Sequence, residues 1–296
     1  MTVDVFYSPA YVQAAHSFDT TRKAGWIAAS LIESPIIGVE LVEPEPLSPI
    51  DLLAVHDATY VDAVKTGTPR SLATSQGFEW DEGLWTMALA TNGGAVAAAR
   101  TALDRGVAGS LSSGLHHARR DRGKGFCTFN GLVLAARGAL DAGAAAVLIL
   151  DLDAHCGGGT TSLIADEPRI WHCDVSVSSF DSYTSGDRAS LSLVHSAERY
   201  LPTIEQALAA LDANAPRFDL CVYNAGMDPF EHSAVGGLRG ITHEMLARRE
   251  HLVFAWCRSR NIPIAFVLAG GYIGSGLDEA GLVSLHRLTP SAAVSS

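Results

Sequence analysis

The sequence of 296 residues has few cysteines, no long apolar run and no excess of positive charge. Its five cysteines are odd in number and form no Cys-x-x-Cys pair, which argues against both a disulfide framework and a thiolate zinc site. No uninterrupted apolar stretch reaches the ~18 residues of a spanning helix, and the N-terminus shows no secretory pattern. We therefore expect no membrane span and a cytoplasmic location.

The 21 Lys and Arg residues are outnumbered by 32 Asp and Glu residues, which gives a formal net charge of −11. A general nucleic-acid binder needs a basic surface to neutralise phosphates, so we expect no nucleic-acid partner. With 48% hydrophobic and 18% charged residues, the composition is that of a folded globular protein.

Short apolar runs alternate with longer segments rich in alanine and leucine. They predict strands at 3–6, 107–111, 146–150, 169–173, 218–223 and 262–268, and helices near 20–33, 84–105, 131–142, 197–212, 242–260 and 276–287. This alternation is typical of the α/β class, with a mostly parallel sheet between two layers of helices. No long linker or repeat divides the chain, so we expect a single domain over 1–296.

The run from Leu148 to His155 is an apolar strand that ends in three polar side chains at two-residue spacing. Alternate residues of an extended chain point the same way, so Asp151, Asp153 and His155 can share one face. Carboxylate and imidazole groups at the end of a parallel strand are typical of a divalent metal site. A cap of the next turn is the structural alternative.

Three other predicted strands also end in polar or glycine-containing segments. These segments are 112–118, with His116 and His117, 224–229, with Asp228, and 269–272, which ends in Tyr272. In an open parallel sheet, ligands lie beyond the carboxyl ends of the strands. This coincidence favours a functional site.

We infer that Asp153, His155 and Asp228 are the metal ligands, because three protein ligands leave a position for water, as catalytic sites require. Zn²⁺ is the first choice, and the oxygen-rich set would also accept Fe²⁺. His116 and His117 are candidate general acid and base, with Asp151 placed to orient one imidazole. Tyr272 could donate its hydroxyl to a developing oxyanion.

At these residues the chain resembles the histone deacetylase superfamily, which has an arginase-like fold. The matching segments are 114–118 (Gly-Leu-His-His-Ala), 125–130 (Gly-Phe-Cys-Thr-Phe-Asn), 151–155 (Asp-Leu-Asp-Ala-His), 225–228 (Ala-Gly-Met-Asp) and 270–272 (Gly-Gly-Tyr). Four finer segments, 16–19, 121–127, 222–226 and 249–254, resemble the class IV branch.

The resemblance implies zinc-dependent hydrolysis of an N-acyl-lysine or related N-acyl amine by attack of metal-bound water. It assigns the metal ligands, the two histidines and the tyrosine as above. It also implies that Gly125, Phe126 and Tyr183 line an acyl-lysine tunnel. The resemblance also implies a monovalent cation, K⁺, near the backbone around Asp151, Asp153 and His155.

The chain departs from the family pattern at Gly158, where many members have an aspartate that orients the second active-site histidine. We therefore expect His117 to lack its partner, to be less basic and to be held more loosely. The rim aspartate that grips the substrate backbone has only Asp81 as a candidate.

Three alternatives remain open at the sequence level. A binuclear ureohydrolase would need carboxylates at Gly157 and Gly226, so one metal is favoured. A non-catalytic acyl-lysine-binding protein is suggested by the missing carboxylate at Gly158. An acetylpolyamine or other small N-acyl amine could also be the substrate, and the sequence fixes neither the acyl chain length nor the oligomeric state.

Overall fold

A computed structural model describes residues 2–14, 16 and 18–295, so Ser17 of the segment 16–19 lies outside the described residues. Its central element is one sheet with the strand order β2-β1-β3-β8-β7-β4-β5-β6, and every pair of neighbours is parallel. The strands are β1 (Val3–Phe6), β2 (Val39–Val42), β3 (Val107–Ser110), β4 (Val147–Asp151), β5 (Ile170–Ser176), β6 (Ala189–Leu193), β7 (Leu220–Ala225) and β8 (Ile264–Leu268).

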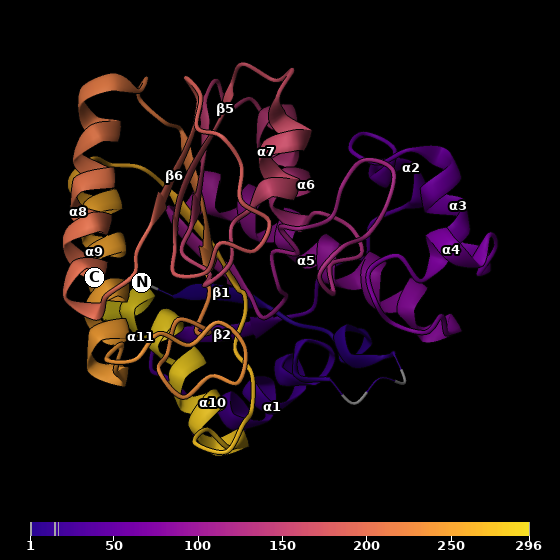
Figure 1. Ribbon diagram of the computed structural model, residues 1–296, viewed down its shortest axis with the longest axis horizontal. Coiled ribbons are helices and arrows are strands. Elements are labelled where there is room, and N and C mark those ends of the chain that lie inside the picture. The colour runs from indigo at the N-terminus through magenta and orange to yellow at the C-terminus, as the bar shows by residue number, and fades with distance from the viewer. Residues whose placement is uncertain (1, 15, 17, 296) are drawn as a thin grey trace.

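Helices cover both faces of this sheet (Figure 1). One face packs against α5 (Glu82–Arg105), α6 (Gly131–Asp141) and α7 (Gly158–Ile164), and α3 (Ala58–Thr66) packs against α5. The other packs against α1 (Asp19–Glu33), α8 (Ala197–Asn214), α9 (His243–Ser259), α10 (Glu279–His286) and α11 (Leu288–Ser295). Three short helices, η1 (Pro9–Val12), α2 (Pro49–Leu52) and α4 (Arg70–Ala73), complete the described elements.

The residues of β4 show how the two cores are separated. Leu148 and Leu150 pack into the core beneath α8 and α9, whereas Val147 and Ile149 pack into the core beneath α5 and α6. Both sides of the strand are therefore apolar, as a strand buried on two faces requires. The predicted three-layer α/β/α fold is confirmed.

All six predicted strands are present with small shifts at their ends. The sequence did not indicate β2 and β6, which lie at the two edges of the sheet and are only partly buried. An edge strand pairs on one side only, so it needs no continuous apolar run. The helix α7 was also missed, because it begins within the glycine run at 157–159 that reads as a turn.

The strand order places the expected site at one edge of the sheet. β3, β8, β7 and β4 are consecutive neighbours and run in the same direction, so their carboxyl ends meet. The residues that follow these four strands are therefore brought together, as expected. Among the helices of the described residues, none is both long and apolar enough to cross a membrane.

Candidate active site

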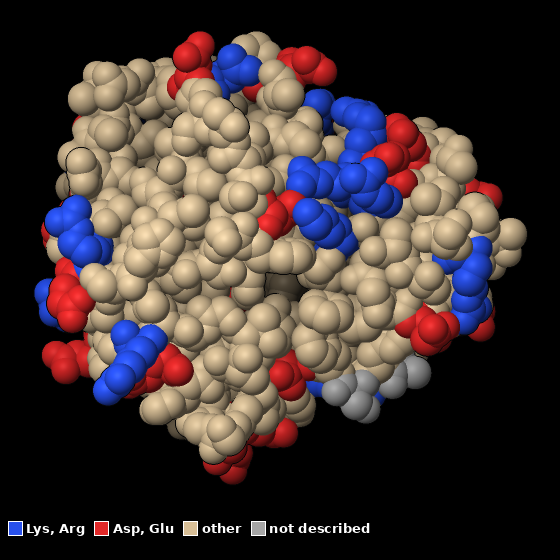
Figure 2. All heavy atoms as spheres, in the orientation of Figure 1, with Lys and Arg blue, Asp and Glu red and all other residues tan. Residues whose placement is uncertain are grey.

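A narrow cavity of about 30 Å³ lies where these loops meet, with His116, His117, Gly125, Phe126, Asp153 and Tyr272 among its lining residues. That volume holds roughly two water molecules at 10–15 Å³ each. Figure 2 shows a hollow near the centre of one face of the molecule, with Lys and Arg side chains gathered beside it. The cavity thus contains most of the residues that the sequence singled out.

Asp153, His155 and Asp228 form a compact group of buried donors whose ligand atoms all lie within 4.8 Å of one another. Nδ1 of His155 is 3.2 Å from Oδ1 of Asp153 and 3.1 Å from Oδ2 of Asp228. Burial, and then the charge of Asp153, raises the pKa of Asp228 to about 6. Two buried carboxylates held this close repel each other unless a cation lies between them.

The donor set fits a divalent cation. Oδ2 of Asp228 is fully buried and faces Nδ1 of His155 without a well-formed hydrogen bond to the described residues, so a cation could bind both atoms. One oxygen of each carboxylate already accepts a backbone hydrogen bond: Oδ1 of Asp228 accepts from the Ala154 amide, and Oδ2 of Asp153 accepts from the Gly270 amide. A Cβ at Gly270 would collide with the Asp228 carboxylate, so glycine is needed for this approach.

Asp151 lies behind the metal ligands and contacts His116, as expected. Nδ1 of His116 donates to Oδ2 of Asp151 at 2.7 Å, and the other carboxylate oxygen accepts from the Asn224 side-chain amide at 2.8 Å. Burial alone would lower the pKa of His116, but Asp151 and Asp153 raise it to about 10. His116 is therefore positively charged at neutral pH in the metal-free protein.

The expectation that His117 lacks a carboxylate partner is wrong. Its Nδ1 donates to Oδ2 of Asp181 at 3.0 Å, and Asp181 lies on the loop after β5 rather than on the loop after β4. Its ring orientation is therefore fixed. Its basicity is lowered, as expected, but for another reason: burial, and then the charge of His116, lowers the pKa of His117 to about 4.

Gly125, Phe126 and Tyr272 lie on the cavity wall, as expected. Phe126 also packs against Phe18, with ring centroids 4.4 Å apart, and Phe18 packs against Tyr272 at 5.6 Å. Tyr272 is held by its backbone amide, which donates to the Ser233 hydroxyl. An aromatic wall of this kind suits an apolar substrate chain.

Two sequence-based assignments do not agree with the structure. Tyr183 does not line the cavity: its hydroxyl donates to the Ser190 carbonyl at 2.9 Å and its ring stacks on His172. Asp81 is not a free rim residue, because it caps α5 through the Leu84 amide and lies 2.9 Å from Nε2 of His16. Both side chains contact partners outside the cavity, and the spacing of residues in the sequence does not reveal these contacts.

Two further residues of the site were given no role in the sequence analysis. Phe180, rather than Tyr183, sets its ring edge against His117 and His155, at centroid distances of 5.0 and 6.0 Å. The buried Arg249 donates to the carbonyls of Leu152 and Gly226 and so ties together the loops after β4 and β7. The only sequence signal for Phe180 was its place in a long loop after a strand.

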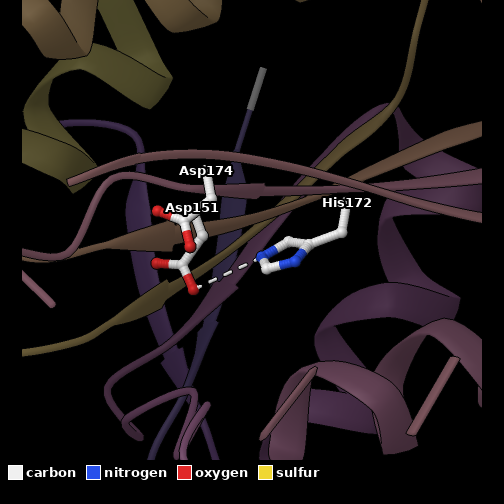
Figure 3. A group of neighbouring side chains, drawn as sticks. All are labelled: Asp151, His172 and Asp174. Carbon is white, nitrogen blue, oxygen red and sulfur yellow. Dashed lines mark ion pairs between the residues drawn. The ribbon is translucent and has the colours of Figure 1, made fainter. Parts of the chain in front are cut away.

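A second polar group, Asp151, His172 and Asp174, lies deeper in the sheet (Figure 3). Nε2 of His172 is 3.7 Å from Oδ2 of Asp151. Oδ2 of Asp174 already accepts from the Gly157 amide at 2.7 Å, and its Oδ1 accepts from the Ser176 hydroxyl. The carboxylates of this group are thus used internally. The expected K⁺ near Asp151 stays a prediction.

The binuclear alternative is opposed by the packing at the two positions that it needs. A Cβ at Gly226 would lie 2.5 Å from the Cα of Asp153, and one at Gly157 would lie 2.8 Å from the Asp151 carboxylate. Neither position has room for a carboxylate side chain. The packing therefore opposes a second metal bound by carboxylates at these two positions.

Comparison with known proteins agrees with this geometry. The family model for the histone deacetylase domain matches residues 16–286. The chain belongs to the histone deacetylase family. The family is metal-dependent, in line with the donor group described above. The match covers almost the whole chain, so the shared sequence pattern is not limited to the site.

Two curated relatives extend over most of this histone deacetylase family member. Histone deacetylase 2 of Arabidopsis thaliana is 28% identical over 294 residues, covering 92% of this chain and 75% of the relative. An uncharacterized protein of Picosynechococcus is 33% identical over 305 residues, covering 99% of each. A solved structure of acetylpolyamine aminohydrolase from Burkholderia pseudomallei superposes with a TM-score of 0.80 at 19% identity, covering 98% of each chain, and shows the shared fold.

Proposed function

We propose that this chain is a zinc-dependent deacylase that hydrolyses the amide of an N-acetylated lysine or a closely related N-acyl amine, with the whole chain as one catalytic domain. The observation that carries the proposal is the convergence of Asp153, two histidines with opposite pKa shifts and a tyrosine on one narrow cavity, where Asp153 belongs to a group of three buried metal donors. A divalent cation held by Asp153, His155 and Asp228 would polarise the acyl carbonyl and acidify a water molecule.

The two histidines divide the proton transfers between them in this proposal. His117 is neutral, and its Nδ1 proton is committed to Asp181, which leaves the Nε2 lone pair to accept a proton from the attacking water. His116 carries a positive charge and can give a proton to the leaving amine. A pair of titratable groups with pKa values pushed apart in this way marks an acid and a base.

In this proposal the Tyr272 hydroxyl would donate to the oxyanion that forms on the carbonyl oxygen.

The size of the cavity supports a short acyl group. A cavity of about 30 Å³ has room for an acetyl group more readily than for a long chain, which would have to displace side chains such as Phe126. The resemblance to the class IV branch is the argument for testing longer chains.

The charge beside the cavity favours an acyl-lysine peptide over a polyamine. The segment 119–124 contains three arginines and one lysine, and Figure 2 shows basic side chains beside the hollow. Only part of this charge is neutralised, by Asp121 and Asp181. A polycationic substrate would be repelled there. An acetylated polyamine remains the second candidate because the solved structure named above is an acetylpolyamine aminohydrolase.

The test is a substrate panel. The zinc- or iron-loaded protein is given lysine peptides acylated from acetyl through myristoyl, together with acetylated polyamines, and the release of free amine is measured. We expect the highest kcat/KM for the acetylated peptides. Binding without hydrolysis across the panel would overturn the enzyme assignment in favour of an acyl-lysine-binding protein.

A further inference from the structure

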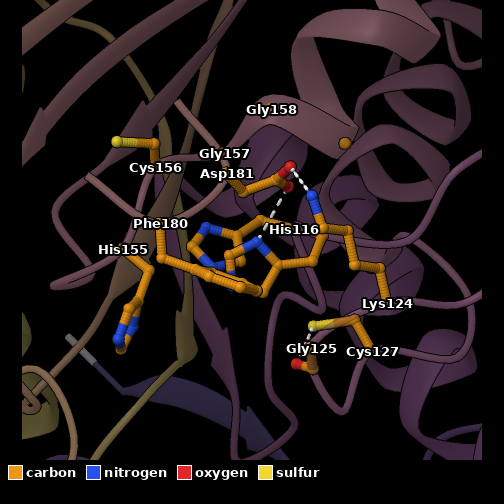
Figure 4. A network of polar contacts seen from close by, with 12 residues as sticks. His116, Lys124, Gly125, Cys127, His155, Cys156, Gly157, Gly158, Phe180 and Asp181 are labelled. Atoms are coloured by element: carbon orange, nitrogen blue, oxygen red, sulfur yellow. Dashed lines mark hydrogen bonds and ion pairs between the residues drawn. The ribbon is translucent and has the colours of Figure 1, made fainter. Parts of the chain in front are cut away.

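Asp181 lies outside the segments that carry the family resemblance, and it is the centre of a polar network around His117. One carboxylate oxygen accepts from Nδ1 of His117 at 3.0 Å, and the other accepts from both Arg119 and Lys124. Its side chain is only 1% exposed. Figure 4 shows the Asp181 carboxylate next to Gly158, with Lys124 reaching toward it.

Gly158 leaves the space that Asp181 occupies. A Cβ built at Gly158 would overlap the backbone oxygen of Asp181 and lie 3.1 Å from its Cγ. The Gly158 carbonyl accepts from Arg119, the same guanidinium that contacts Asp181. A side chain at position 158 and the present course of the loop after β5 are therefore mutually exclusive.

From this geometry we propose that Asp181 is the positioning residue of His117, and that it takes over from a different loop the task that a carboxylate at position 158 would perform. The inference rests on the proposed function only for its kinetic test. Asp181 does not touch the cavity that would hold the substrate, so it acts through His117.

Arg119 and Lys124 explain how a carboxylate can stay ionised at this buried place. Two cationic donors on one oxygen offset the cost of removing the Asp181 charge from water. An ionised Asp181 can only accept, so it fixes the His117 tautomer with the proton on Nδ1 and leaves Nε2 unprotonated.

The same loop also shapes the wall of the site. Phe180, the neighbour of Asp181, sets its ring edge against His117, and the Lys124 ammonium lies 5.3 Å from the Phe180 ring centroid. A displacement of this loop would therefore move the wall and the histidine partner together.

The kinetic test is a double-mutant cycle on the metal-loaded protein with its best substrate from the panel. We expect Asp181→Asn to lower kcat by roughly 10–100-fold, with KM and metal content little changed, since losing an orienting partner has effects of that size. In a His117→Ala background the same substitution should have no further effect. Asp187→Asn, an exposed change on the same loop, is the control and should match the wild type.

A second variant covers the case in which Asp181→Asn does not fold. Gly158→Ala keeps every charge but forces the Asp181 backbone away, so it should lower kcat in the same way and show no additional effect with His117→Ala. The proposal is overturned if folded variants keep wild-type kcat, or if their losses are equally large without His117.

A spectroscopic measurement separates this inference from the proposed function. If the wild-type protein hydrolyses nothing, the side-chain ¹⁵N shifts of His117 still report its tautomer. We expect the Nδ1-protonated form in the wild type and a changed spectrum in Asp181→Asn. An identical His117 spectrum in the two proteins would contradict the role of Asp181.

Discussion

The two adjacent histidines are the same residue type in the sequence, but their surroundings shift their pKa values in opposite directions. His116 faces Asp151 and Asp153, and its pKa is raised to about 10 despite burial. His117 faces one carboxylate that Arg119 and Lys124 also contact, and burial together with His116 lowers its pKa to about 4. Their partners, rather than their order in the chain, therefore distinguish the candidate acid from the candidate base.

At the residue scale, the role of Tyr272 is tested by removing only its hydroxyl. We expect Tyr272→Phe to lower kcat by at least ~100-fold, the scale of losing an oxyanion donor. Metal content, measured by atomic emission, should not change, because the hydroxyl is not a ligand. Tyr183→Phe is the matched control, since that hydroxyl contacts Ser190 outside the cavity. Equal kcat values for the two variants would refute the assignment.

The metal donors could be predicted from the sequence because each follows an apolar strand directly. Asp153, His155 and Asp228 stand within four residues of the ends of β4 and β7. Asp181 could not be predicted in this way, because its contact with His117 depends on the path of an irregular loop. The sequence shows that position 158 is a glycine, but it does not show that this glycine leaves room for the carboxylate of Asp181.

At the scale of elements, a buried histidine supports the segment that follows His116 and His117. Nδ1 of His56 donates to the Arg119 carbonyl at 2.8 Å, and its Nε2 accepts from the Asn130 amide at 3.0 Å. This single imidazole therefore ties the two ends of the segment 119–130, which contains Gly125 and Phe126. The accepted hydrogen bond requires an unprotonated Nε2.

His56 predicts a pH-dependent stability. Burial lowers the pKa of His56 to about 4, whereas the unfolded value is about 6.5. Between these values the unfolded chain binds more protons, so this contribution to the free energy of unfolding is complete above pH ~6.5 and is lost as the pH falls to about 4. The loss is on the order of 3 kcal/mol at most.

Urea denaturation at several pH values measures this dependence. Other buried histidines, such as His117, titrate in the same direction, so the comparison is between the wild type and His56→Gln. Glutamine keeps a donor and an acceptor but does not titrate. We expect the variant to lose part of the slope between pH 6.5 and 4, and parallel curves for the two proteins would disprove this source of pH dependence.

For the whole molecule, the sheet order determines the site. Central strands were recognisable because burial on both faces demands continuous apolar runs, as in β4 and β7. The edge strands β2 and β6 could not be recognised from the sequence. The order of the strands could not be recognised either, because strand pairing depends on contacts between segments that are distant in the sequence. That order brings the ends of β3, β8, β7 and β4 together and so assembles site residues that lie up to 156 residues apart, from His116 to Tyr272.

The most direct test is to titrate metal into the metal-free protein while following deacetylation of an acetyl-lysine peptide. We predict that activity rises with Zn²⁺ or Fe²⁺ and saturates near one equivalent per chain. We also predict that Asp153→Asn lowers activity at that concentration by at least ~100-fold, because a ligand is lost. Full activity in the metal-free protein, or a wild-type titration curve for Asp153→Asn, would contradict a catalytic metal at Asp153, His155 and Asp228.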